Sequence, residues 1–148
     1  MKLFALLPFL IAAPLAAQEV SDCRDNYITH AENIAEPWAD NTATFANGDV
    51  RIAVMDTLEP AAAAFHLLIL SPPYGEAGER QCRLVSANNR SGFATLTLDG
   101  LESDYDPETG LTLVMTAGLF GADMTEPEEH TLIVTLNQAS GDVTAALK

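Results

Sequence analysis

The chain has 148 residues, 21 of them acidic and 7 basic, and its formal net charge is −14 at pH 7. Nucleic-acid phosphates and anionic membrane surfaces are bound through clustered Lys and Arg, so this balance argues against both as partners. It fits a cationic protein, a polyamine or a divalent metal, or an acidic surface that only keeps the protein in solution. Residues 91–147 hold ten acids and no Lys or Arg, so we expect any cationic partner to contact them.

Residues 1–17 have the features of a secretory signal peptide. A positive start precedes about nine apolar residues, far fewer than the roughly 20 that cross a bilayer, and a small-residue end comes next. This pattern predicts cleavage before Gln18, although a buried N-terminal element is the alternative. Because Gln18 stands where a lipoprotein would carry Cys, we expect no membrane anchor. Residues 18–148 are then one exported soluble domain, periplasmic or extracellular, whose oligomeric state stays open.

Cys23 and Cys82 are the only cysteines. In an oxidising compartment an even count predicts a disulfide, and neither Cys has the CxxC partner of a redox or zinc motif. The bridge would close a loop of about 60 residues and stabilise the fold by about 4 kcal/mol. Residues 21–36 show an apolar stripe at helical spacing between a capping Ser21 and Pro37, which predicts one short N-terminal helix.

The remainder of the chain has a β pattern. Asn47-Gly48, between two alternating segments, is a strong hairpin signal. Short strands joined by turn residues predict a mostly β fold, a small antiparallel β-sandwich or barrel. We expect Trp38 to fill the core, with an anchor on a binding surface as the alternative. The expected strands cover residues 42–46, 50–58, 63–70, 81–86, 93–101, 111–120, 131–136 and 143–147.

No motif identifies an enzyme. The G-x-S-x-G elbow, the S-x-x-K pair and the Gly-rich phosphate loops are missing from the sequence. The histidines, none of which has the spacing of a metal motif, are His30, His66 and His130. His66 shares a strand face with leucines, which predicts a hydrogen-bonded core residue. The alternative is a small hydrolase or lyase that uses His66, or carboxylates, with a divalent metal.

An acidic cluster precedes and enters a tight turn, and carboxylate oxygens suit Ca²⁺. Its members, the candidate metal ligands, are Glu102, Asp104, Asp106 and Glu108. The spacing departs from an EF-hand, because Gly110 stands at position 7 instead of 6 and Met115 at position 12 instead of Glu. A solvated hairpin tip is the simpler interpretation, and no other cofactor is expected.

The function favoured by the sequence is non-catalytic. We expect an exported, disulfide-bonded acidic β domain that binds a partner or supports an envelope assembly, with a cationic protein as the candidate partner. An inhibitor of a basic hydrolase is one concrete form. The alternatives are a small hydrolase or lyase and a Ca²⁺-dependent structural or adhesion module.

Overall fold

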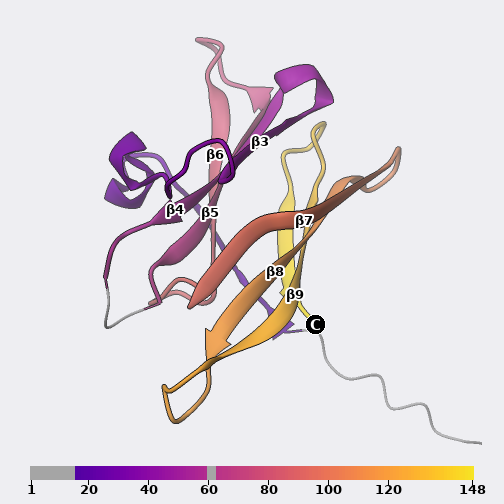
Figure 1. Cartoon of the computed structure of the whole chain (residues 1–148). Helices are drawn as coiled ribbons and strands as arrows, with labels where there is room; N and C mark the ends of the chain where they lie inside the picture. The colour runs from indigo at the N-terminus through magenta and orange to yellow at the C-terminus, as the bar shows by residue number, and fades with distance from the viewer. Residues whose placement is uncertain (1–15, 60–62) are drawn as a thin grey trace, which may run out of the picture.

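The computed structural model describes residues 16–59 and 63–148. Within that part of the chain, ten strands form two five-stranded antiparallel sheets that stack as a β-sandwich (Figure 1). Sheet A has the order β1-β10-β9-β8-β7, and sheet B has the order β2-β6-β5-β4-β3. The expected mostly β fold is confirmed. The strands are β1 (Ala16–Ala17), β2 (Glu19–Asp22), β3 (Thr42–Phe45), β4 (Val50–Asp56), β5 (Phe65–Tyr74), β6 (Arg80–Ser86), β7 (Thr95–Asp106), β8 (Gly110–Phe120), β9 (Pro127–Leu136) and β10 (Val143–Leu147).

The main core lies between the sheets, where the inward side chains of the alternating strands meet. Val54 and Leu67 of sheet B and Leu113 and Val134 of sheet A are all at most 1% exposed. Fully burying a side chain of this kind stabilises a fold by about 1.5–3 kcal/mol. The period of two in the sequence thus sets which face of each strand points inward.

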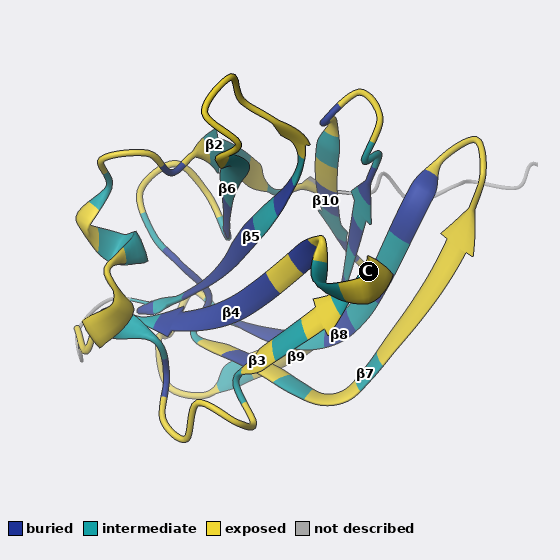
Figure 2. Cartoon of the chain, turned by 90° about the horizontal axis from the view of Figure 1, so that it is seen from above, coloured by how far each residue is buried: buried dark blue, intermediate teal, exposed yellow. Residues whose placement is uncertain are grey.

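A second apolar cluster covers the outer face of sheet B. Met55, Leu68 and Leu84 pack there around Cys23, beneath residues 23–36. This cover explains why β4 and β5 are apolar on both faces and appear mostly dark blue in Figure 2. The expected disulfide is confirmed: Cys23 is bonded to Cys82 of β6, with their Cα atoms 5.3 Å apart.

The helix expected over residues 21–36 is wrong. Its first residues end β2, and beyond them the chain forms two three-residue 3-10 turns, η1 (Tyr27–Thr29) and η2 (Ala31–Asn33). Polar side chains here bond the backbone in place of a helical ladder: Asn26 Oδ1 accepts from Ile28 N, and Asn33 Nδ2 donates to Tyr27 O. Cys23, Ile28 and Ile34 of this segment pack on sheet B, whereas Tyr27 and Ala31 of the expected stripe are exposed.

Three other expectations need correction. Trp38 is 49% exposed and is not a core residue. β5 does not stop at residue 70 but continues through Pro72 and Pro73 to Tyr74. β7 runs to Asp106 and β9 begins at Pro127, because both keep pairing with β8 beyond the expected ends. Proline is tolerated at the first position of a strand.

On one side of the sandwich, the two sheets are joined by a segment of the chain and by hydrogen bonds. The N-terminal segment passes from β1 in sheet A to β2 in sheet B, and Gln18 N donates to Ala145 O of β10 at 2.9 Å. Gln81 Nε2 of β6 donates to Gly141 O, also at 2.9 Å. On the opposite side the edge strands are β3 and β7.

The expected signal peptide, residues 1–17, lies outside the described residues except for the two residues of β1. Over residues 16–59 and 63–148, no helix is long and apolar enough to span a bilayer.

Candidate functional site

The open side of the sandwich is the one where β3 ends sheet B and β7 ends sheet A (Figure 2). Each is the last strand of its sheet in the described part of the chain, so one row of its backbone N–H and C=O groups has no neighbouring strand. Two cavities open between them. We call this side, from the start of both strands to their ends, the β3–β7 groove.

The first cavity lies at the start of both strands and has a volume of about 630 Å³. Asp99 of β7 and Asp40, two residues before β3, contribute two exposed carboxylates. A β-bulge between Thr97 and Glu102 interrupts the pairing of β7 with β8 next to this cavity. The lining residues are Pro37, Asp40, Asn41, Thr97, Leu98 and Asp99.

The second cavity lies at the end of both strands and has a volume of about 340 Å³. It is mostly apolar, with Phe45 from β3, Tyr105 from β7 and the buried Leu111 from β8. Tyr105 is 61% exposed, so its ring is accessible to a ligand at this cavity. Ala46 and Gln138 complete the lining.

The expected Ca²⁺ ligands are not assembled into a site. Glu102 and Asp104 are exposed on β7, and Asp106 stabilises the turn after that strand, where its Oδ1 accepts from the N–H groups of Glu108 at 2.8 Å and Thr109 at 2.9 Å. These hydrogen bonds, that of Thr109 foremost, hold the pKa of Asp106 below its usual value. Among the described residues, no group of three or more His, Cys, Asp or Glu is placed to hold a metal ion.

His66 lies on the outer face of sheet B and is buried, as expected. Its Nδ1 lies 2.8 Å from Ser86 Oγ, because the two residues face each other across β5 and β6. Both line a polar cavity of about 220 Å³, in which Glu19 is the one acidic residue.

Burial lowers the pKa of His66 below its usual 6.5. The unfolded chain therefore takes up this proton at a higher pH than the folded one, so neutral His66 stabilises the fold above about pH 6.5, and this contribution is lost as the pH falls further. We expect denaturant unfolding of the His66→Asn variant to show a smaller loss of stability between about pH 7.5 and pH 5.5 than the original chain. The same pH dependence in both proteins would contradict this assignment.

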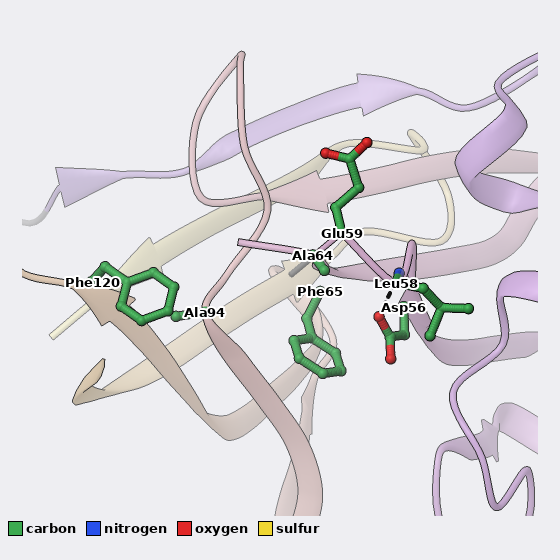
Figure 3. Close-up of a pocket in the computed structure, with 7 residues that line it drawn as sticks. All are labelled: Asp56, Leu58, Glu59, Ala64, Phe65, Ala94 and Phe120. Atoms are coloured by element: carbon green, nitrogen blue, oxygen red, sulfur yellow. Dashed lines mark hydrogen bonds between the residues drawn. The ribbon is translucent and has the colours of Figure 1, made fainter. Parts of the chain in front are cut away.

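A further cavity, of about 310 Å³, opens beside the start of β5 (Figure 3). Phe65 and Phe120 give it an apolar wall, and Asp56 and Glu59 stand at its rim. Figure 3 shows Asp56 Oδ1 accepting the N–H of Leu58, at 2.8 Å, so this carboxylate serves the local turn. No cluster of convergent polar groups marks this cavity as a site.

Comparisons of this chain with protein-family models, with curated proteins and with solved structures found no match. Sequence reasoning identified the acids of β7 but missed Tyr105 of the same strand as a lining residue, and it missed Asp40 and Phe45 as residues that lie near β7. β3 and β7 are far apart in the sequence, and nothing in either segment indicates that they share a groove. An aromatic residue between acids, as in Ser103-Asp104-Tyr105-Asp106, could have suggested a contact surface on β7, but not its neighbours.

Proposed function

We propose that this protein is an exported, non-catalytic binding module that holds an extended, cationic segment of a protein partner along the β3–β7 groove. The observation that carries the proposal is β7 itself: a twelve-residue edge strand without a second neighbour in the described chain, and with exposed carboxylates along it. Export is supported by the features of residues 1–17 and by the disulfide, which persists in oxidising compartments.

The negative charge of β7 is not neutralised within the described part of the protein. The ion pairs found there join Arg24 to Glu79, His30 to Glu32 and Arg83 to Asp22. None of them involves β7, and the chain has no Lys or Arg between residues 91 and 147. A cationic segment would supply the missing counter-charge.

The same charges favour one kind of partner over another. An unpaired edge strand can accept a further strand from any chain, and like charges placed opposite each other weaken such pairing. Two β7 edges would bring Glu102 and Asp104 against the same residues of a second copy, whereas a Lys- or Arg-bearing strand gains both backbone hydrogen bonds and opposite charges. The acidic edge thus selects against self-association and for a basic ligand.

This proposal predicts salt-sensitive binding of a polylysine peptide of the same length as β7, measured by calorimetry. Binding should weaken as salt is added, because exposed charges are screened within about 10 Å at 0.1 M salt. The triple variant Asp99→Asn, Glu102→Gln, Asp104→Asn should bind about tenfold more weakly.

The control triple variant Glu126→Gln, Glu128→Gln, Glu129→Gln removes the same charge from the β8–β9 region, where these side chains are also exposed. It should change the affinity by about twofold or less, through the general field alone. If both triple variants weaken the affinity for polylysine equally, or if the affinity does not change with salt concentration, a site at β7 is contradicted.

A further inference from the structure

The two cavities of the β3–β7 groove follow β3 and β7 in the same order. Asn41, the residue directly before β3, and Thr97, near the start of β7, line the first cavity, whereas Phe45 and Tyr105, at the ends of the two strands, line the second. The strands therefore run in the same direction along the groove. A ligand lying along one strand passes both cavities in turn.

β3 measures the distance between the cavities. Asn41 and Phe45 are the nearest lining residues of the two cavities on this side and are four residues apart; a strand rises about 3.3 Å per residue, so the facing edges of the cavities are separated by about 13 Å along β3. An extended ligand covers that length with four residues. Because side chains alternate, ligand residues four apart point to the same side and can both enter the groove.

The cavities differ in chemistry. Asp40 and Asp99 put two exposed carboxylates at the first, and neither carboxylate has an ion pair among the described residues. At the second, Phe45, Leu111 and the exposed ring of Tyr105 form an apolar wall. The first suits an ammonium or guanidinium group, and the second suits an aromatic or long aliphatic side chain.

We infer that the groove recognises an extended peptide segment carrying Lys or Arg and a large apolar side chain four residues apart. The cation pairs with Asp40 and Asp99, the apolar side chain packs on Tyr105, and the free edge of β7 or β3 bonds the peptide backbone between them. This inference rests on the proposed function and adds a spacing rule to it. Charge complementarity favours a cationic occupant, and the apolar second cavity beyond the carboxylates of the first favours a peptide segment, which can carry both kinds of side chain.

The test compares Ser/Thr-rich peptides of one composition that differ only in the separation of one Lys and one Phe. A separation of four positions keeps both side chains on one face, and a separation of three puts them on opposite faces. Both orders, Lys before Phe and Phe before Lys, are made, since a strand can add in either direction. We expect one of the two separation-four peptides to bind about tenfold more tightly than its separation-three counterpart.

Protein variants locate the two contacts. The double variant Asp40→Asn, Asp99→Asn removes the partner of Lys and should abolish the preference for a separation of four over three. Tyr105→Ala removes the surface for Phe and should abolish the same preference. Tyr27→Ala is the control for the second, because Tyr27 is equally exposed, at 63% against 61%, but lies in η1 away from the groove. It should keep the preference intact.

Two different results would count against these ideas. If polylysine and all peptides bind with salt sensitivity but separations of three and four are equal, the spacing rule is overturned and the cationic binding function stands. If neither polylysine nor any peptide binds, both the function and the spacing rule are overturned. A preference that survives loss of Asp40 and Asp99 or of Tyr105 overturns the assignment of the anchors.

Discussion

Replacing Gly110 with Ala should destabilise the protein by about 2–4 kcal/mol in urea unfolding. Gly110 begins β8 with φ +97°, a conformation that residues with a Cβ rarely adopt. An added Cβ would also collide with Leu136 O and lie 2.9 Å from Asn137 Cα. Both obstacles are backbone atoms at the end of β9, so relief requires the β8–β9 pairing to shift.

Gly78→Ala separates the cost of the positive φ from the cost of the collision with the backbone. Gly78 has φ +83°, but an added Cβ there meets nothing within 4 Å. That variant should lose only about 1 kcal/mol, from the backbone conformation alone. Equal losses at Gly110 and Gly78 would show that the β8–β9 contact yields easily, contrary to the close packing around Gly110.

Loss of the disulfide should have the second large effect. The double variant Cys23→Ala, Cys82→Ala removes a link between residues 59 apart, which the chain-entropy model values at about 4 kcal/mol. This is a large part of the roughly 5–15 kcal/mol that stabilises a typical domain. Cys23 is also 1% exposed within the cluster on sheet B, so the link holds the cover formed by residues 23–36 in place.

Urea unfolding of the double variant and of the reduced original chain measures this effect. Both should unfold at a clearly lower denaturant concentration than the oxidised protein. Amide hydrogen exchange should quicken most in residues 23–36, while β8 and β9 of sheet A stay protected. Unfolding midpoints that do not depend on the bridge would contradict its stabilising role.

The strands were predictable because their signals are local. The alternation of apolar and polar residues in β8 and β9 indicates which face of each strand is buried. The Asn47-Gly48 turn indicates the hairpin between β3 and β4. The cysteine count likewise sufficed for the disulfide. The prediction of a helix over residues 21–36 was wrong. An apolar residue every three or four positions also occurs in an irregular segment that packs on a sheet, and periodicity alone does not distinguish that segment from a helix.

The groove was not predictable in the same way. Asp99 and Tyr105 belong to one strand, but the cavities they line also need Asp40 and Phe45. Those two residues come close to β7 only because the two sheets stack, which the sequence does not indicate. Asp106 had two interpretations in the sequence, a Ca²⁺ ligand or part of a solvated hairpin tip. In the structure its carboxylate accepts hydrogen bonds from the N–H groups of its own turn.

Amide chemical shifts followed by NMR during titration with the polylysine peptide would locate the ligand on the protein. Binding along the groove predicts shifts concentrated in β3 and β7, largest from Asp99 to Tyr105, with β6 and β10 on the closed side unchanged. Shifts spread evenly over all exposed acids, or confined to the β8–β9 loop, would contradict a binding site between β3 and β7.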